Sequence, residues 1–99
     1  KPSWFGFMIS LKTSEKFSRN NFTKFLEDKN IQTRLLFSGN IIKHPCFDLI
    51  RNTSAYRIVG GLENTDFIMN NSFWIGVYPG LSKEKLQYMG RVLLEYLDR

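Results

Sequence analysis

The sequence has few of the residues on which disulfide-bonded, metal-binding and membrane proteins depend. It contains one cysteine, Cys46, and one histidine, His44, in 99 residues. A lone cysteine cannot form a disulfide within the chain, which favours a reducing compartment, so we expect a cytoplasmic protein. No apolar run approaches the roughly 20 residues of a membrane-spanning helix, so we expect no membrane span.

Groups that carry out catalysis are equally scarce. No His, Cys, Asp and Glu residues share metal-ligand spacing, and no Ser or Cys stands in a nucleophile motif. Gly60-Gly61 lacks the strand-to-helix pattern of a phosphate-binding loop. His44 precedes Pro45 and is either a loop residue, the commoner case, or a functional group. We therefore expect no metal site, no catalytic residue and no self-contained enzyme.

Charge narrows the choice of partners only slightly. The formal net charge is +5, from 14 Lys and Arg against 9 Asp and Glu. This excess permits an acidic partner such as a nucleotide, a nucleic acid or a membrane surface. However, Lys16, Arg19 and Lys24 alternate with Glu15 and Glu27, a pattern typical of an ordinary solvated surface.

The residues from Thr65 to Leu81 are the part around which the chain is organised. They predict a short helix capped by Asn64 or Thr65, then a strand, then a turn. One side of that strand carries Phe73, Ile75 and Val77, and the other carries Trp74, Gly76 and Tyr78. Pro79-Gly80 is typical of a type II turn.

A strand from Trp4 to Leu11 repeats this design. Phe5, Phe7, Ile9 and Leu11 alternate with Trp4, Gly6, Met8 and Ser10. Both strands thus have an apolar face and a second face with Trp, Gly and a large side chain. Since glycine weakens a strand unless something approaches closely, one side of the sheet should be covered. The cover is either another body or a helix of this domain.

The other elements follow from caps and apolar stripes. Ser18 predicts a helix start, with Phe17 and Phe22 as a hydrophobic staple, and the helix should end near Lys29. Lys12 to Phe17 is a polar connection. Ile31 to Phe37 predicts the second strand, and helical turns are expected at Ile41–Lys43 and within Cys46–Ile50.

Ser82 predicts the start of the last helix. Within that helix, Glu95 and Arg99 form an i,i+4 pair, and Gly90 indicates close packing. The fold class is therefore α+β: a small, mainly antiparallel three-stranded sheet with helices packed on one face. Residues 1–99 form a single domain. Because the chain starts at Lys1 and not at Met, we expect a piece of a longer protein.

Three segments together resemble a known family. They are Ser3-Trp4-Phe5-Gly6-Phe7, Ile31 to Asn40 (IQTRLLFSGN), and Thr65 to Leu81, of which Phe73 to Leu81 (FWIGVYPGL) is the most specific. They are similar to the C-terminal small domain of the DegT-type, pyridoxal-phosphate-dependent sugar aminotransferase family. The dehydrase branch, the CDP-4-keto-6-deoxyglucose 3-dehydrases of lipopolysaccharide O-antigen synthesis, is the most similar.

That resemblance implies a longer enzyme with a large cofactor domain ahead of Lys1. The parent would use pyridoxal or pyridoxamine phosphate as an electron sink to remove the C3 hydroxyl of a nucleotide-linked, most simply CDP-linked, 4-keto sugar. It also implies an iron–sulfur reductase partner and a homodimer. The cofactor-binding and catalytic residues would lie in the large domain, so no role of that kind falls to His44 or to any lysine here.

The resemblance further implies that this domain closes over the active site, with the end of its second strand facing the sugar nucleotide. Arg34 is the first candidate substrate contact, because guanidinium offers several donors to phosphate or sugar oxygens. Phe37, Ser38 and Asn40 are the next candidates. Arg34 as a plain surface cation and Asn40 as a turn residue are equally open. Phe67 departs from the family pattern, in which this position is commonly Arg.

Two alternatives stay open at this stage. The same domain could belong to a nucleotide-sugar aminotransferase, which only the large domain would distinguish. From a different class, Phe5 to Ile9 resembles the aromatic strand of an RNA-recognition module. It opens the chain instead of following a strand and helix, and its flanking cations are missing, so no nucleic-acid partner is expected.

Overall fold

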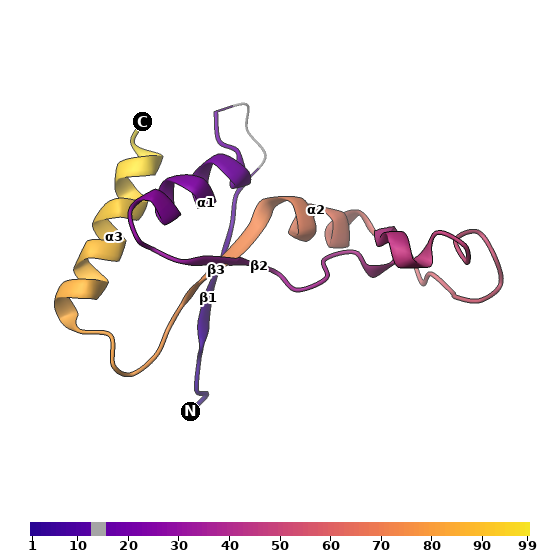
Figure 1. Cartoon of the computed structure of the whole chain (residues 1–99), viewed down its shortest axis with the longest axis horizontal. Coiled ribbons are helices and arrows are strands. Elements are labelled where there is room, and N and C mark those ends of the chain that lie inside the picture. Colours follow the sequence, from indigo (N-terminus) through magenta and orange to yellow (C-terminus); the bar gives the residue numbers. More distant parts are fainter. Residues whose placement is uncertain (13–15) are drawn as a thin grey trace.

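The computed structural model describes residues 1–12 and 16–99, and the polar connection predicted from Lys12 to Phe17 lies partly outside them. Figure 1 shows the course of the chain. Its elements are β1 (Gly6–Ser10), α1 (Arg19–Asp28), β2 (Thr33–Leu35), the 3-10 turns η1 (Ile41–Lys43) and η2 (Pro45–Phe47), α2 (Glu63–Asn71), β3 (Ser72–Gly76) and α3 (Lys83–Leu97). The predicted α+β class and element order are confirmed.

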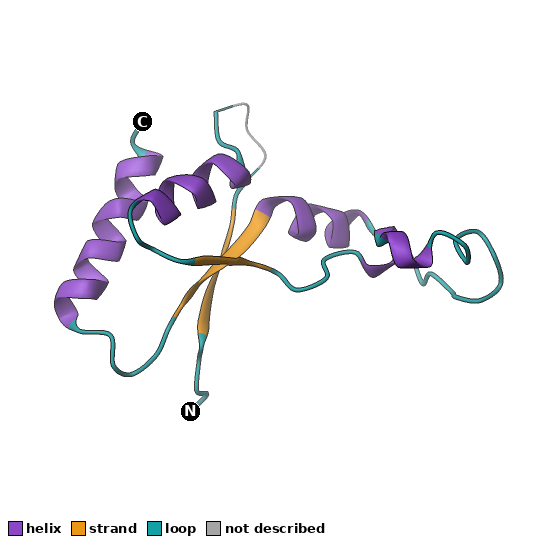
Figure 2. Cartoon of the chain, viewed as in Figure 1, coloured by secondary structure: helices purple, strands orange, loops and turns teal. Residues whose placement is uncertain are grey.

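Strand β3 is the centre of a three-stranded antiparallel sheet with the order β1-β3-β2 (Figure 2). On one face, Ile75 stands opposite both Phe7 and Thr33, and Phe73 stands opposite Ile9 and Leu35. The register therefore follows the apolar alternation of the sequence, as it must when one face is buried.

Helices α1 and α3 cover that face and form the core with it. The buried apolar residues are Leu11, Phe22, Leu26, Ile31, Phe73, Ile75, Val92 and Tyr96. Phe22 lies at their centre: its ring stacks on Tyr96 with centroids 4.1 Å apart and meets Phe73 edge-on at 5.4 Å. One side chain thus joins α1, α3 and β3. Phe7, on the edge strand, is left 60% exposed.

The second face of the sheet is not covered by a helix within the part of the chain that the structure describes. Met8, Trp74 and Arg34 stand in one register row across the three strands, and Met8 is 52% exposed. Trp74 lies over Gly6, where an added Cβ would come within 2.7 Å of the indole. Glycine is needed there for this contact. The alternative of a helix of this domain on this face is therefore wrong.

The residues between β2 and β3 form an arm that projects from this body, which Figure 1 shows on the right. Its elements are η1, η2 and α2. Gly39, with φ +60°, packs directly against Met69, and the Arg51 side chain donates to the carbonyls of Ile42 (2.8 Å) and His44 (3.1 Å). The radius of gyration is 16.8 Å, whereas a compact chain of this length has about 13 Å.

Several boundaries differ from those predicted. β2 ends at Leu35 and not at Phe37, because the backbone turns sharply there: the Phe37 N–H donates to the Leu35 carbonyl (2.8 Å). Helix α2 begins at Glu63 with Leu62 at its N-cap, so neither Asn64 nor Thr65 caps it. Ser18 stands at the N-cap of α1 as predicted, but its side chain makes no capping bond.

The turn before α3 also needs correction. The Leu81 N–H donates to the Tyr78 carbonyl (3.2 Å), which confirms a turn. A type II turn requires a positive φ at Gly80, whereas the described glycines with positive φ are Gly39 and Gly60. The turn is therefore not type II.

Helix α3 matches its prediction closely at both ends. The Ser82 hydroxyl accepts from the Lys85 N–H (3.3 Å) at the N-cap, and Glu95 pairs with Arg99 (3.8 Å). Gly90 is the exception: nothing lies within 4 Å of an added Cβ, so the predicted close packing is absent. Within residues 1–12 and 16–99, no helix combines the length and the apolar character that crossing a membrane requires.

Candidate functional site

The four candidate substrate contacts lie in one continuous segment that runs from β2 toward the arm. Arg34 stands on β2 opposite Trp74, and the sharp turn after Leu35 places Phe37 and Ser38 on the connection to η1. The segment is attached at both ends: Arg34 and Leu35 pair with β3, and Asn40 bonds to Asp66 of α2.

Arg34 is exposed, and its guanidinium is oriented by its neighbours on the strand. Nη1 donates to the Thr33 carbonyl (3.1 Å). In the amide orientation that satisfies both groups, the Gln32 side-chain oxygen accepts from Nη1 (3.0 Å) and Nη2 (2.7 Å). No carboxylate among the described residues forms an ion pair with Arg34. The guanidinium is thus positioned by Gln32 and Thr33, and its charge also helps to lower the pKa of the nearby Glu27 carboxyl.

Glu27 of α1 fixes the start of the same strand. Its Oε1 accepts from the hydroxyl (2.7 Å) and the backbone N–H (3.2 Å) of Thr33. These two bonds, the hydroxyl first, lower the pKa of the Glu27 carboxyl below its usual value. The carboxylate is therefore engaged in holding helix to strand.

Phe37 combines an unusual backbone with an exposed ring. Its φ of 40° is an outlier for a bulky residue, and such strain tends to occur at functional sites. The ring meets Trp74 edge-on with centroids 4.9 Å apart, yet 78% of the residue is exposed. Phe5 also meets Trp74 edge-on, with ring centroids 4.9 Å apart. Phe5, Trp74 and Phe37 therefore form an aromatic ledge, and Arg34 stands opposite Trp74 in the sheet.

Ser38 and His44 contact each other within this segment. The Ser38 carbonyl and His44 Nε2 are 2.6 Å apart, and since a carbonyl can only accept, Nε2 donates. His44 is half-buried and follows η1, where its ring steadies the start of the arm. The interpretation of His44 as a loop residue agrees with this contact.

Asn40 is buried and already bonded. Its side-chain Nδ2 donates to Asp66 Oδ1 (2.8 Å), and Lys43 pairs with the same carboxylate (2.9 Å). These contacts, Asn40 first, hold the pKa of the Asp66 carboxyl below its ordinary value. Asn40 thus ties the segment to α2. Phe67 lies on the same helix and is 38% exposed.

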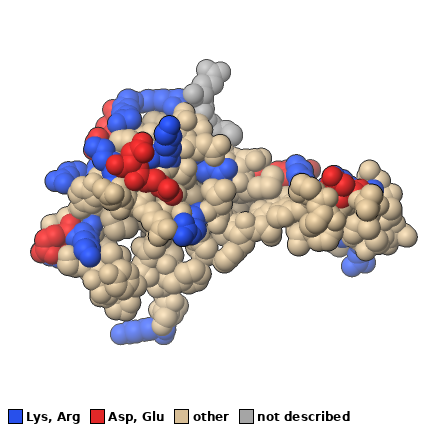
Figure 3. All heavy atoms as spheres, viewed as in Figure 1, with Lys and Arg blue, Asp and Glu red and all other residues tan. Residues whose placement is uncertain are grey.

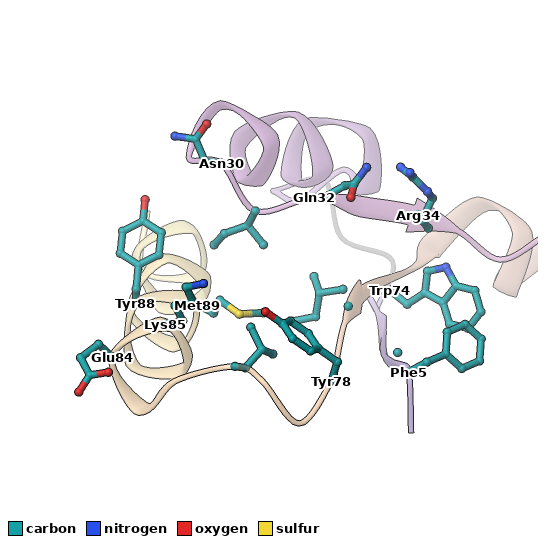
Figure 4. Close-up of a pocket in the computed structure, with 15 residues that line it drawn as sticks. Phe5, Asn30, Gln32, Arg34, Trp74, Tyr78, Glu84, Lys85, Tyr88 and Met89 are labelled. Atoms are coloured by element: carbon teal, nitrogen blue, oxygen red, sulfur yellow. The ribbon is translucent and has the colours of Figure 1, made fainter. Parts of the chain in front are cut away.

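A groove of about 720 Å³ lies beside Arg34, between α3 and the end of the sheet (Figure 4). It is lined by Phe5, Gly6, Asn30, Ile31, Gln32, Arg34, Trp74, Ile75, Gly76, Tyr78, Leu81, Glu84, Lys85, Tyr88 and Met89. Of the four candidates, Arg34 alone lines it. The alternating Trp and Gly residues of the strands indicated one wall of this groove from the sequence. The wall formed by α3 was not predicted, because its residues belong to an apolar helix stripe and to the polar positions beside it.

The described residues form no cluster of metal-ligating side chains. No three of their His, Cys, Asp and Glu side chains come together to hold a metal ion, and Cys46 is exposed. Figure 3 shows basic and acidic side chains interspersed on the visible face, with wide uncharged areas between them.

Comparison with known proteins gives consistent matches. A model of the DegT/DnrJ/EryC1/StrS aminotransferase family matches residues 1–93. The chain is 52% identical over 88 residues, 89% of its length, to "Lipopolysaccharide biosynthesis protein RfbH" of Salmonella typhimurium. It is 43% identical over 98 residues, 99% of its length, to dTDP-4-dehydro-2,6-dideoxy-D-glucose 3-dehydratase of Saccharopolyspora spinosa.

These relatives are much longer. The chain spans 19% of the Salmonella protein and 20% of the Saccharopolyspora protein, about a fifth of each. A solved structure of E. coli GDP-4-keto-6-deoxy-D-mannose-3-dehydratase with bound hydrated PLP superposes with a TM-score of 0.74 and 20% identity. It covers 89% of this chain and 22% of the larger one. At that identity the likeness shows the fold.

Proposed function

This chain belongs to the DegT/DnrJ/EryC1/StrS aminotransferase family, and from that premise we propose that it is the C-terminal small domain of a nucleotide-sugar 3-dehydratase. The parent enzyme works in deoxysugar and lipopolysaccharide biosynthesis. One observation carries this proposal: over nearly its whole length the chain is 43% identical to a nucleotide-sugar 3-dehydratase. The 52% identity to a lipopolysaccharide biosynthesis protein supports the same assignment.

Residues 1–99 would form the lid of that enzyme, with the segment from Arg34 to Asn40 facing the substrate. Arg34 would donate to phosphate or sugar oxygens, which its exposed and oriented guanidinium supports. Phe37 would offer the exposed edge of the aromatic ledge, and Ser38 its hydroxyl. Asn40 would act through its bond to Asp66 by holding the segment in place.

The parent enzyme would use pyridoxal or pyridoxamine phosphate. The groove offers two cations, Arg34 and Lys85, but the nearby carboxylates of Glu27 and Glu84 are engaged, Glu84 at the start of its own helix. His44 is engaged with Ser38. These residues do not by themselves fit a pyridoxal group. Its binding would therefore fall to the part of the protein outside these 99 residues.

The remaining partners follow from the same proposal. The substrate would be a nucleotide-linked, most simply CDP-linked, 4-keto-6-deoxy sugar, and an iron–sulfur reductase would supply electrons. The parent would be a cytoplasmic homodimer. Since β1 is an edge strand of a three-stranded sheet, this fold does not support the alternative of an RNA-recognition module, which has four strands.

The test uses the protein encoded by the complete reading frame, incubated with a nucleotide-linked 4-keto-6-deoxyhexose, a reductase and NADH. Mass spectrometry should detect a product that has lost the C3 hydroxyl. An amino sugar formed with glutamate as donor would identify an aminotransferase instead. The 99-residue chain alone should show neither pyridoxal absorbance nor turnover, and turnover by it would overturn the proposal.

A further inference from the structure

The Arg34 guanidinium uses part of its hydrogen-bonding capacity on its own strand. Nη1 donates to the Thr33 carbonyl (3.1 Å) and to the Gln32 side-chain oxygen (3.0 Å), and Nη2 donates to that same oxygen (2.7 Å). Gln32 lies two residues before Arg34, so both side chains extend from the same side of the backbone. Figure 4 shows them end to end. Gln32 therefore binds the edge of the guanidinium that joins Nη1 to Nη2.

Two donors of Arg34 remain, the Nε–H and the second N–H of Nη2. They are parallel, because Nη2 is the terminal nitrogen on the Nε–H side of the planar group. Within residues 1–12 and 16–99, the bonds of Arg34 are those to Gln32 and Thr33, and none uses this second edge. An edge with two parallel donors has the spacing of two oxygens on one phosphate or carboxylate group.

Gln32 orients this edge without cancelling the charge of Arg34. An amide carries no net charge, whereas a carboxylate in its place would form an ion pair with the guanidinium. The charge of Arg34 contributes to the lowered pKa of the Glu27 carboxyl, but less than the two bonds from Thr33 do. The second edge of the guanidinium thus combines oriented donors with a positive charge, and this combination favours an anion.

The strand beneath Arg34 is attached to two other elements. Thr33 pairs with Ile75 of β3, and its hydroxyl and backbone N–H both donate to Glu27 of α1. The Thr33 carbonyl that binds Nη1 therefore belongs to a backbone held by sheet and helix. The orientation of the rest of the guanidinium depends on Gln32.

We propose that Arg34 binds two oxygens of the diphosphate of the nucleotide sugar through Nε–H and Nη2–H, and that Gln32 is the positioning residue that orients this edge. The inference rests on the proposed function, which gives the parent a nucleotide-linked substrate. It narrows the ligand of Arg34 from phosphate or sugar oxygens to phosphate. Gln32 and Arg34 both line the groove, and its volume of about 720 Å³ is in the range of small-molecule sites.

The test is isothermal titration calorimetry of the protein encoded by the complete reading frame. The ligands are CDP, dTDP and GDP, together with the nucleoside of the diphosphate that binds most tightly, measured by competition. Gln32→Met is the main variant, since Met has nearly the length of Gln but no carbonyl oxygen. We expect the Kd of the diphosphate to rise about five- to tenfold, because the guanidinium is no longer oriented before binding. The Kd of the nucleoside should change by less than about twofold, and an equal rise for both ligands would overturn the assignment to phosphate.

Arg34→Lys separates positioning from direct contact. An ammonium has no planar edge for Gln32 to orient, so Gln32→Met should change the Kd of the diphosphate by less than about twofold in the Arg34→Lys background. Equal losses in both backgrounds would overturn the positioning role. Gln87→Met is the matched control, because Gln87 is exposed on α3 and does not line the groove. It should leave the Kd within about twofold of the wild-type value.

Thermal denaturation without nucleotide distinguishes the diphosphate from a carboxylate of the parent protein, which has the same two-oxygen chemistry. If the diphosphate is the ligand of Arg34, the Tm values of Gln32→Met and Arg34→Lys should lie within about 2 °C of wild type. A larger fall in both variants would show that the protein itself occupies the edge, and would overturn the proposal.

The 3-dehydratase assay on the same preparation is read separately. A protein that lacks this activity, yet loses diphosphate affinity with Gln32→Met as described, would refute the proposed function and support the assignment of Gln32 and Arg34. An active enzyme whose diphosphate Kd is unchanged by Gln32→Met would refute that assignment alone. A wild-type protein that binds none of the three diphosphates would also overturn it.

Discussion

Arg34 and Asn40 show how two neighbouring polar residues can have different roles. Arg34 is exposed and oriented by Gln32 and Thr33, and no carboxylate of the described residues lies within ion-pair distance of it. Asn40 is only 2% exposed, and its side-chain amide donates a hydrogen bond to Asp66. The first is suited to bind a ligand, and the second to hold the segment that carries the first.

Replacing Arg34 by Ala in the full-length enzyme should lower kcat/KM for the nucleotide sugar by about 10- to 100-fold. A charge-assisted hydrogen bond contributes about 1.5–3 kcal/mol, and that is the interaction lost. Arg34→Lys should recover only part, because an ammonium cannot bond two oxygens in the same fixed plane. Steady-state kinetics with Arg91→Ala as the control measure this. Equal values for Arg34→Ala and wild type would remove Arg34 from the site.

The contact between Asn40 and Asp66 predicts a pH dependence. The Asp66 pKa is lower in the folded chain than in the unfolded one, so this carboxylate stabilises the fold above the unfolded value of about 3.9. That stabilisation is lost as the pH falls through the folded pKa. Urea denaturation at pH 7, 5, 4 and 3 should show wild type more stable than Asp66→Asn at pH 7, with the difference closing below about pH 4.

Asp98→Asn, at the C-terminal end of α3, is the control for this titration. Glu27, whose pKa is lowered in the same direction, is present in all three proteins and cancels from the comparison. A constant difference between wild type and Asp66→Asn across the whole pH range would contradict the prediction.

Among the elements, α3 could be predicted almost completely from the sequence, whereas the arm could not. Helix α3 carries local signals, the Ser82 cap and an apolar stripe, and local signals suffice for a helix that packs along its length. The sequence also predicted that Phe73 and Ile75 share the core face. The arm depends on Asn40 reaching Asp66, 26 residues away, and no local pattern encodes such a pairing. The groove could not be predicted, because it depends on the distance between α3 and the sheet, which no local sequence pattern specifies.

Gly90 is the residue of α3 whose packing was predicted wrongly from the sequence, and this yields a prediction. An added Cβ there meets nothing within 4 Å, so Gly90→Ala should raise the free energy of unfolding by about 1 kcal/mol, the difference in helix propensity. Gly6→Ala should do the opposite and cost about 1–3 kcal/mol, because its Cβ would meet the Trp74 ring at 2.7 Å. Urea denaturation of the 99-residue chain measures both. The same sign for both variants would contradict the packing described for Gly6 and Gly90.

At the scale of the molecule, a small core supports an extended shape. The longest dimension is 53 Å and the shortest is 22 Å. Among the described residues, eight apolar ones are buried, while large apolar side chains such as Leu49, Val59 and Phe7 stay exposed. A chain of this kind has a small free energy of unfolding, because much of its apolar surface lies outside the core and does not stabilise the fold. Stability should therefore depend on very few contacts.

Phe22→Ala tests this dependence. Removing the ring that joins Phe73 to Tyr96 should cost about 3–5 kcal/mol, and small domains have about 5–15 kcal/mol in total. We therefore expect the 99-residue variant to be largely unfolded at 37 °C, with its tryptophan fluorescence already shifted to that of the denatured chain before urea is added. Phe37→Ala is the matched control, because that ring is 78% exposed and its loss should cost less than about 1 kcal/mol. If both variants lost stability equally, the core would not be centred on Phe22, and the second face of the sheet would contribute as much to folding as the face that α1 and α3 cover.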